Sequence, residues 1–251
     1  MAYKRLSTYK IRNNYSKRYA LVTDYESAYG KEIVSCLIND GYSVIVFSKK
    51  NKKTKDIKSI KINWLSKEEI NTVLQGIIPE LVILNHSMLP EYNKFQEMDC
   101  NKMSAVLFHN INTRLIIAKH CINKMHVTGK GNIINVINFL AFRPFPYLSL
   151  YSATQSFLLN SFEGIAKEVK INNIKIRNFS IDLFNQNNIT LDYKMMARKT
   201  LDSLNKNKIT TIYEKKNIML NLLNKLSSRS AVVNCTFRQG ENFINCNECN
   251  H

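Results

Sequence analysis

The sequence predicts a single α/β domain, doubly wound and Rossmann-like, with a parallel sheet and helices on both faces. Three continuous apolar runs indicate this fold: YALVT at 19–23, YSVIVFS at 42–48 and ELVIL at 80–84. Such runs are typical of parallel strands that are buried on both faces. The stretches between them carry helical apolar stripes, and 251 residues of which 45% are hydrophobic can bury one sizeable core.

Within this plan, residues 19–226 form the predicted domain, 1–18 a basic leader and 227–251 a tail that contains cysteines. The leader is expected to be disordered. An organelle presequence is the alternative, because Lys and Arg recur up to residue 23 without any acidic residue.

The first predicted unit is strand, helix and strand over 19–48, a β-α-β arrangement. Its helix is indicated by a stripe of apolar residues that ends at a glycine: Ile33, Val34, Leu37, Ile38 and Gly41. In a doubly wound fold, the turn between the first strand and this helix is where backbone amides cradle a dinucleotide.

The remaining elements follow from the same patterns. A helix is expected at 65–76, with Ser66 as its N-cap and Glu69 in the capping-box position. The stretch 100–124 predicts one long helix or two abutting helices. Further strands and helices are expected at 131–137, 172–184, 192–204 and 214–226. The last of these is basic and amphipathic, and packing against the core is favoured over resting on an anionic membrane.

Asn138, Tyr151 and Gln155 form the constellation whose spacing predicts chemistry. The strand at 131–137 leads to Asn138, thirteen residues before Tyr151, and Gln155 lies four residues after the tyrosine on one helical face. A phenol serves as a general acid only if its pKa of about 10 is lowered, and a cation one turn along the helix is the usual means. Gln155 stands at that position and carries no charge.

This segment resembles the catalytic stretch of the short-chain dehydrogenase/reductases, whose pattern is Ser, then Tyr thirteen residues on, then Lys four residues later. Within that superfamily, PFPYLSLYSATQSFL, LVILNHSMLPEY and IRNFSIDLF are most similar to the 3-oxoacyl-CoA reductases of fatty-acid elongation and the hydroxysteroid dehydrogenases. The resemblance covers 19–226. It implies Tyr151 as the acid, Asn138 in place of the serine, and Asn110 and Gln155 as remnants of the proton relay.

The resemblance also implies a cofactor site at the first turn, where the family reads Thr-Gly-x-x-x-Gly-x-Gly. Only Thr23 and Gly30 match that pattern. Asp24 and Glu26 instead place two carboxylates where phosphates would lie, and like charges at short range repel. A plain strand-to-helix turn is therefore favoured, and retained dinucleotide binding is the alternative.

Three further positions bear on the cofactor. In the resembled reductases a basic residue at the place of Lys49 meets the 2′-phosphate, so NADP(H) is the cofactor expected if any binds; a solvated lysine loop is the alternative. Asn85 is the single match to the family's Asn-Asn-x-Gly, and the neighbouring His86 is expected to be a strand-end residue. The Pro-Gly pair that covers the nicotinamide is replaced by Ile181 and Asp182.

Two functions remain open on these observations. The favoured one is a weak or non-catalytic family member, a pseudoenzyme that binds a partner and keeps a family-type homodimer through the helix of Tyr151. The cradle, the lysine and the nicotinamide cover have changed together, as expected once selection for the cofactor relaxed. The alternative is an active NADPH-dependent 3-oxoacyl-CoA reductase of fatty-acid elongation, acting in lipid metabolism on a lipid-like ketone.

Charge and hydropathy limit the partners. The net charge is +17, but the excess of Lys and Arg is spread along the chain, so no nucleic-acid partner is predicted. No apolar run approaches the roughly 18 residues of a membrane span. A cytoplasmic location is expected, with at most a peripheral association at the endoplasmic reticulum.

The six cysteines fall into two groups. Cys36, Cys100 and Cys121 lie in apolar-periodic segments and are expected to be core thiols of a reducing compartment. The tail carries four soft ligands that could close a tetrahedral zinc site: Cys235, Cys246, Cys249 and His251. Their spacing fits no standard zinc motif, so an unstructured tail is favoured over zinc binding.

Overall fold

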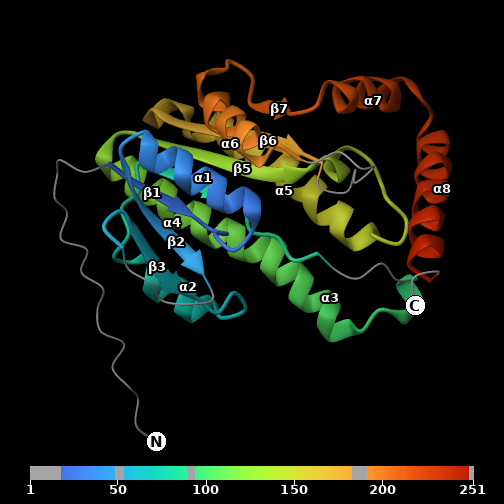
Figure 1. Ribbon diagram of the computed structural model, residues 1–251, viewed down its shortest axis with the longest axis horizontal. Coiled ribbons are helices and arrows are strands. Elements are labelled where there is room, and N and C mark those ends of the chain that lie inside the picture. Colours follow the sequence, from blue (N-terminus) through green and yellow to red (C-terminus); the bar gives the residue numbers. More distant parts are fainter. Residues whose placement is uncertain (1–17, 49–53, 90–93, 183–190, 249–251) are drawn as a thin grey trace, which may run out of the picture.

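The sheet formed by the described residues is parallel throughout and has seven strands. The computed structural model describes residues 18–48, 54–89, 94–182 and 191–248 (Figure 1). The strand order is β3-β2-β1-β4-β5-β6-β7, and every neighbouring pair is parallel. The strands are β1 Arg18–Val22, β2 Tyr42–Ser48, β3 Ile57–Lys61, β4 Leu81–Leu84, β5 Gly131–Asn138, β6 Ile174–Ile181 and β7 Thr210–Ile212. The doubly wound fold predicted from the sequence is confirmed.

Helices cover both faces of this sheet (Figure 1). The helices of the described residues are α1 Ala28–Asn39, α2 Lys67–Leu74, α3 Cys100–Leu107, α4 Thr113–Thr128, α5 Ser149–Glu168, α6 Tyr193–Asp202, and the peripheral α7 Lys215–Leu226 and α8 Arg229–Glu248. Short 3₁₀ turns occur at Phe95–Glu97, Phe139–Phe142, Val169–Asn172 and Ser203–Asn205.

In the described part of the chain, one apolar core on each face of the sheet holds helices to the strands. The α2, α4 and α5 helices pack on one face, and α1 and α6 on the other. Successive residues of β1 alternate between them: Leu21 belongs to the first core, whereas Ala20 and Val22 belong to the second. This period of two, with apolar residues on both faces, explains why the strands read as continuous apolar runs.

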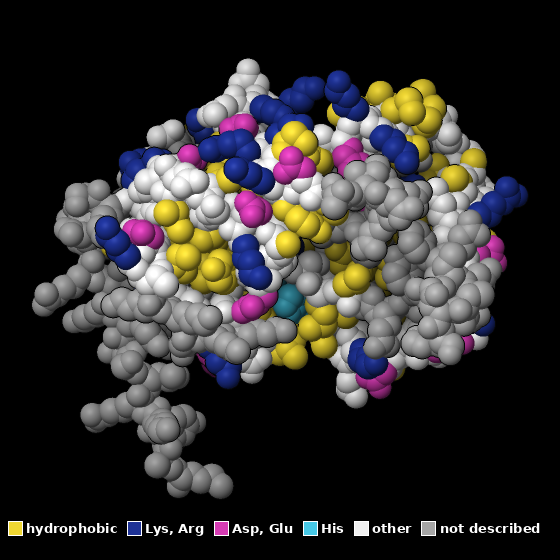
Figure 2. Space-filling view, viewed as in Figure 1, with side chains coloured by type: hydrophobic (Ala, Val, Ile, Leu, Met, Phe, Trp, Pro, Cys, Tyr) yellow, Lys and Arg dark blue, Asp and Glu magenta, His cyan; other side chains and the backbone are white. Residues whose placement is uncertain are grey.

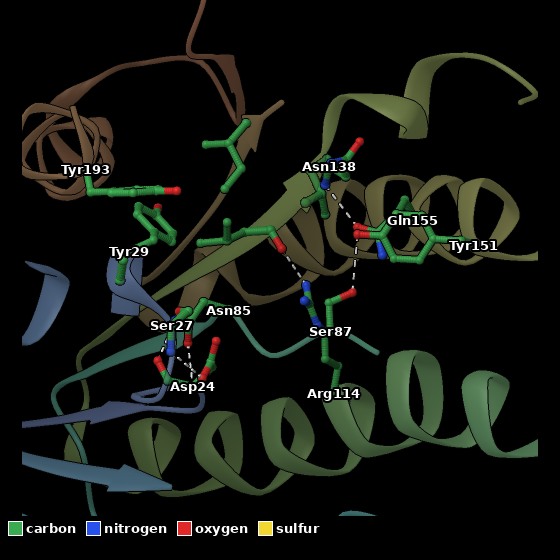
Figure 3. Close-up of a pocket in the computed structure, with 14 residues that line it drawn as sticks. Asp24, Ser27, Tyr29, Asn85, Ser87, Arg114, Asn138, Tyr151, Gln155 and Tyr193 are labelled. Carbon is green, nitrogen blue, oxygen red and sulfur yellow. Dashed lines mark hydrogen bonds between the residues drawn. The ribbon is translucent and has the colours of Figure 1, made fainter. Parts of the chain in front are cut away.

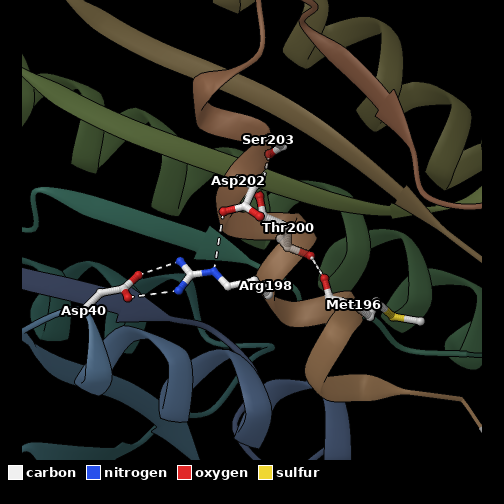
Figure 4. Close-up of polar contacts among 6 residues, drawn as sticks. All are labelled: Asp40, Met196, Arg198, Thr200, Asp202 and Ser203. Carbon is white, nitrogen blue, oxygen red and sulfur yellow. Dashed lines mark hydrogen bonds and ion pairs between the residues drawn. The ribbon is translucent and has the colours of Figure 1, made fainter.

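An ion pair ties α6 to the end of α1. The guanidinium of Arg198 forks onto the carboxylate of Asp40 at 3.0 and 2.7 Å and also reaches Asp202 at 3.5 Å (Figure 4). The Arg198 guanidinium lowers the pKa of Asp40. Because the Arg198 side chain is 45% exposed, this ion pair contributes at most about 1 kcal/mol.

The helix expected at 65–76 is α2, and half of its predicted capping box is present. The Ser66 hydroxyl accepts from the backbone N–H of Glu69 at 3.2 Å. The Glu69 carboxylate does not return to Ser66 but accepts from the backbone N–H of Asn63 at 3.0 Å. The carboxylate therefore fixes the loop that precedes the helix.

The stretch 100–124 is two helices joined by a π turn, Phe108–Asn112. A π turn adds a residue to the helical turn and often occurs at functional sites. Here it carries Asn110, which is fully buried. The polar side chain is thereby directed to the protein interior.

Some elements were not predicted. The edge strands β3 and β7 were missed, because IKSIK carries lysines and TTI spans only three residues. The expectation of an unstructured tail is wrong for 229–248, which form α8. This helix buries a narrow stripe, Val232, Thr236 and Gly240, and stacks Phe237 on Tyr147 with ring centroids 5.8 Å apart. A stripe of one residue per turn in a polar sequence gives little periodic signal.

The α7 helix does not pack as expected. The leucines that were assigned to the core are exposed, and its one fully buried residue is Asn217. The prediction that this helix packs its apolar stripe against the core is therefore wrong.

The cysteine predictions are partly correct. Cys36 and Cys121 are buried thiols, but Cys100 is exposed at the start of α3. In α8, Cys246 follows Cys235 with ten residues between them, a rise of about 16 Å along the helix, so the intact helix cannot bring both to one ion. Cys249, His251 and residues 1–17 of the leader lie outside the described residues, whereas Arg18, which was assigned to the leader, begins β1. Those residues contain no group of three or more His, Cys, Asp or Glu side chains arranged to hold a metal.

Among the described residues, no helix combines the length and the apolar character needed to cross a bilayer.

Candidate active site

A pocket of about 280 Å³ lies where β1, β4, β5 and β6 end (Figure 3). In open α/β sheets, ligands bind in the crevice at these carboxyl ends. The polar residues that line it come from the loops after these strands and from α1, α4, α5 and α6: Asp24, Ser27, Tyr29, Asn85, Ser87, Arg114, Asn138, Tyr151, Gln155 and Tyr193. The structure thus gathers Tyr151, Asn138 and Gln155, as the sequence predicted, with Asn85 at the other side.

Gln155 is bonded to the protein itself. Its side-chain oxygen accepts from the backbone N–H of Asn138 at 2.9 Å (Figure 3). The Asn138 side-chain oxygen accepts in turn from the backbone N–H of Leu140 at 2.9 Å and caps the 3₁₀ turn that follows β5. The amide nitrogens of both side chains are buried with no hydrogen-bond partner among the described residues. Both side chains therefore serve to position the end of β5.

Tyr151 sits in an environment that disfavours its ionised form. The side chain is 4% exposed, and Ser87 donates its hydroxyl to the phenol oxygen at 3.3 Å. Burial raises the pKa of Tyr151, although the Ser87 hydrogen bond and the charge of Arg114 act in the opposite direction. A phenol with a raised pKa gives up its proton less readily than the tuned acid of a reductase.

Arg114 is a buried cation that the sequence reasoning missed. It is 1% exposed and rises from α4 toward the pocket (Figure 3). Its guanidinium donates to the backbone oxygens of His86 and Val136 and to the Asn135 side-chain oxygen, the last at 2.8 Å. Burial lowers the pKa of Arg114 to about 10. The signal in the sequence was an arginine on the buried face of α4, four residues after Asn110.

Asn110 holds the segment that leaves β4. Its side-chain oxygen accepts from the Met88 backbone N–H at 2.7 Å, and its nitrogen donates to the Met88 carbonyl at 2.9 Å. The same nitrogen reaches the Thr154 hydroxyl on α5 at 3.4 Å. These bonds join the π turn, the β4 exit and the helix of Tyr151, so Asn110 has a structural task whether or not a relay operates.

The first turn is closed by its own carboxylate. Asp24 Oδ1 accepts from the backbone N–H groups of Glu26, at 2.9 Å, and Ser27, at 3.4 Å. These amides precede α1, where backbone donors and the helix dipole favour an anion. Ser27 caps the helix by accepting from the Gly30 N–H at 3.0 Å. The carboxylate of Asp24 thus occupies the donors that a phosphate would use.

Thr23, Asn85 and Gly30 hold this turn in place. Asn85 accepts from the Asp24 N–H and donates to the Asp24 carbonyl, both at 2.8 Å. The Thr23 hydroxyl accepts from the backbone N–H groups of Asn85 and His86 at 2.9 and 3.1 Å. A β-carbon at Gly30 would overlap the Asp24 carbonyl oxygen, so only glycine lets α1 approach so closely. All three matches to the family pattern therefore have a structural role here.

Three positions at the ends of β2 and β6 were expected to bear on cofactor binding: Lys49, Ile181 and Asp182. Ser48, which ends β2, donates to the Glu26 carboxylate at 2.6 Å, so the second acid of the turn also contacts the protein. Lys49 lies outside the described residues. Ile181 lines the pocket and the following Asp182 is buried, at the place where the family has Pro-Gly.

His86 and His109 lie in an aromatic stack beneath the site. Trp64 stacks on His86 with ring centroids 4.5 Å apart, and His109 meets His86 edge-on at 5.2 Å. His86 Nδ1 is 2.9 Å from the Thr23 hydroxyl. Burial, and next the charge of Arg114, holds the pKa of His86 well below its usual value, and burial also lowers the pKa of His109. His86 is thus a buried strand-end residue, as predicted.

These neutral histidines predict a loss of stability in mild acid. Below about pH 6.5 the unfolded chain binds protons at both histidines more readily than the folded chain does, so the free energy of unfolding falls as the pH drops below that value. Each histidine that stays neutral contributes a slope of about 1.4 kcal/mol per pH unit. Urea unfolding at several pH values on either side of the ordinary pKa of histidine, about 6.5, measures the effect.

A His86→Phe variant keeps an aromatic ring stacked on Trp64. Its free energy of unfolding is expected to depend less steeply on pH, by the contribution of one histidine. His126→Gln, at an exposed position of α4, is the matched control for removing a histidine side chain. An unchanged slope in His86→Phe would show that His86 does not cause the pH dependence.

Comparison with known proteins agrees with this geometry. The chain matches the short chain dehydrogenase family over residues 18–187. It is 24% identical over 182 residues to dehydrogenase/reductase SDR family member 4 of Bos taurus, covering 66% of this chain and 65% of that relative. The chain thus matches slightly less than two thirds of that relative's length.

Solved structures show the same fold. A short-chain dehydrogenase from Streptomyces avermitilis superposes with a TM-score of 0.76 at 18% identity, covering 86% of this chain and 94% of that one. A short chain dehydrogenase from Burkholderia cenocepacia J2315, solved in complex with NADP, superposes with a TM-score of 0.72 at 18% identity, covering 86% and 95%.

Proposed function

Because the chain belongs to the short-chain dehydrogenase/reductase family of oxidoreductases, we propose that it is a weak or non-catalytic member of that family, acting as a binding and dimerising protein. The observation that carries this proposal is the Asp24 carboxylate on the amides of Glu26 and Ser27. A bound pyrophosphate would have to displace this carboxylate and then lie beside its charge.

The nucleotide that the site would take is NADP(H). The family and the neighbour solved with NADP support this class of cofactor. The first turn as described does not fit it, because its donors are already bonded to Asp24. At 4 Å, two like charges cost about 4 kcal/mol at an effective dielectric constant of 20, which is enough to weaken binding by a large factor.

The part of the pocket around Tyr151, the candidate general acid, supports the same proposal. In this family pattern a lysine would lower the pKa of the tyrosine, and here Gln155 stands in its place and bonds to the backbone of Asn138. The pKa of Tyr151 is raised by burial. General acid catalysis contributes typically 10² to 10⁴-fold, so the loss of a tuned acid predicts a slow reaction even if nucleotide binds.

An active NADPH-dependent reductase of a 3-oxoacyl-CoA or similar lipid-like ketone is the second candidate. The pocket keeps Tyr151 beside Asn138 at the carboxyl ends of the strands, and this arrangement favours it. In that reaction Tyr151 would protonate the ketone oxygen and an amide N–H of Asn138 would hold it.

The proposed homodimer would use α5. Its outer face presents the exposed residues Ala153, Phe157, Asn160 and Gly164. Phe157 is 43% exposed and small residues flank it, which would let a second helix approach closely.

A nucleotide titration separates the two candidates. We expect no saturable change in NADPH fluorescence up to millimolar NADPH, and no NADPH oxidation when a 3-oxoacyl-CoA is added. Micromolar binding together with turnover would overturn the non-catalytic proposal. Sedimentation of the same samples tests the dimer, and a monomer at all concentrations would remove the dimerising role.

A further inference from the structure

On α7 an apolar stripe faces solvent and the asparagines face the protein, which is the reverse of a helix that covers a core. Its asparagines face the protein: Asn217 is buried, and Asn221 and Asn224 are half-buried. Five apolar side chains of the helix are instead between 43% and 86% exposed: Ile218, Met219, Leu222, Leu223 and Leu226. Figure 2 shows hydrophobic side chains gathered at the upper right, where Figure 1 places α7, with Lys and Arg side chains beside them.

These five residues form one continuous stripe. They are spaced by one, three, one and three positions, which places them along one side of the helix over its whole length. Single exposed apolar residues are common on protein surfaces, but a contiguous apolar patch marks an interaction site. The stripe therefore predicts a partner that covers α7.

The charged side chains of α7 itself are all basic. Lys215 and Lys216 lie in the first turn, Lys225 lies in the last, and Arg229 follows; the sequence has no acidic residue from 215 to 229. Glu214, just before the helix, accepts from the buried Asn217 side chain at 3.2 Å. Lysines in a first turn oppose the helix dipole, so Lys215 and Lys216 do not stabilise α7 itself.

We propose that α7 is a docking helix for an anionic lipid surface. Its leucines, isoleucine and methionine would enter the boundary between headgroups and acyl chains, and the lysines would extend to the headgroup phosphates. The helix has 12 residues, about 18 Å of rise, so it lies in the plane of the surface.

Charge favours lipid over a second copy of the chain. An α7–α7 contact would bring the same lysines of two copies together, whereas the net charge of +17 on the chain favours an anionic surface. An anionic bilayer attracts the whole molecule as well as the helix. The position of α7 at the periphery, beyond the edge strand β7, lets a flat surface reach it (Figure 1).

The test is co-sedimentation of the full chain with vesicles of phosphatidylcholine alone and of phosphatidylcholine with phosphatidylserine. We expect binding to the anionic vesicles, weakened by added salt. Lys215→Gln, Lys216→Gln and Lys225→Gln together should lower the partition coefficient on the order of 100-fold. Leu222→Gln with Leu223→Gln should lower it at least about tenfold. Both variants should keep the melting temperature, because the changed side chains are exposed.

Matched controls carry the same chemical changes elsewhere. Lys167→Gln, Lys170→Gln and Lys175→Gln together remove three exposed lysines, and Val127→Gln with Ile171→Gln removes two exposed apolar side chains. Each control set should retain most of the binding, well above the corresponding α7 variant. The proposal is overturned if the unaltered chain does not bind anionic vesicles, or if the α7 variants bind as the controls do. It is also overturned if Leu222→Gln with Leu223→Gln instead dissociates a dimer that does not bind vesicles.

Discussion

Replacing Asp24 by glycine is expected to raise the affinity for NADPH at least about tenfold. In the unaltered chain the carboxylate accepts from the Glu26 and Ser27 amides at 2.9 and 3.4 Å. Glycine frees both donors and removes a charge near the pyrophosphate, and a tenfold change needs only about 1.4 kcal/mol of the repulsion expected at short range. The loop should keep its path, because Asn85 holds the backbone of residue 24 and not its side chain.

Two further variants distinguish the effect of negative charge in the turn from the effect of the hydrogen bonds that the Asp24 side chain accepts. Asp24→Asn removes the charge but keeps an oxygen that accepts from the same amides, so its affinity should lie between the unaltered chain and Asp24→Gly. Glu26→Gln neutralises the other acid of the turn, which is exposed and accepts from Ser48, and should have the smaller effect. Fluorescence titration with NADPH measures all three.

An affinity in Asp24→Gly equal to that of the unaltered chain would show that the carboxylate is not the obstacle. Adding Gln155→Lys to Asp24→Gly and Ala28→Gly tests the rest of the site. If the scaffold is otherwise intact, a charge on residue 155 should raise affinity again by contact with the nucleotide and lower the pKa of Tyr151.

The fold was predictable because it depends on patterns that repeat along the chain. The strands β1, β2 and β4 are buried on both faces, and this requirement leaves a continuous apolar run in each. The edge strand β3 has the sequence IKSIK and is buried only at Ser59 and Ile60, so a rule built on continuous apolar runs cannot find it.

The residues of the site could be predicted from the sequence, but the hydrogen bonds of their side chains could not. Spacing and the family resemblance placed Asn138, Tyr151 and Gln155 together, since the end of β5 and the first two turns of α5 carry all three. It could not show that Asp24 turns back onto its own loop amides, because the side-chain rotamer depends on donors that the folded turn creates. Arg114 was missed for a related reason: its three acceptors come from β4 and β5, far from it in sequence.

The exposure of the apolar stripe of α7 could not be predicted from the sequence either. The stripe of α7 has the periodicity of a core helix, so the sequence indicated packing. Which side of an amphipathic helix meets the protein is a tertiary property, and here the asparagines Asn217, Asn221 and Asn224 take that side.

Replacing Arg114 by methionine is expected to lower the free energy of unfolding by about 3 kcal/mol. The guanidinium satisfies the backbone oxygens of His86 and Val136 and the side-chain oxygen of Asn135, all inside the protein. Methionine has a similar length and no donor, so these acceptors stay buried without partners, at about 1–3 kcal/mol each before relaxation. The gain from no longer burying a cation offsets part of this loss.

Arg114→Lys and Arg198→Met show whether the stability depends on the hydrogen-bond geometry of Arg114 or only on the presence of a charge. Lysine keeps the charge, but one ammonium cannot reach acceptors on both β4 and β5, so Arg114→Lys should lose about half as much stability as Arg114→Met. Arg198→Met removes an arginine that forks onto Asp40 at the surface, and it should cost at most about 1 kcal/mol (Figure 4). Urea unfolding at neutral pH compares all three with the unaltered chain. If Arg114→Met were as stable as the unaltered chain, the cost of burying the cation would equal the value of its hydrogen bonds, and Arg114 would not be what holds the ends of β4 and β5 at the pocket.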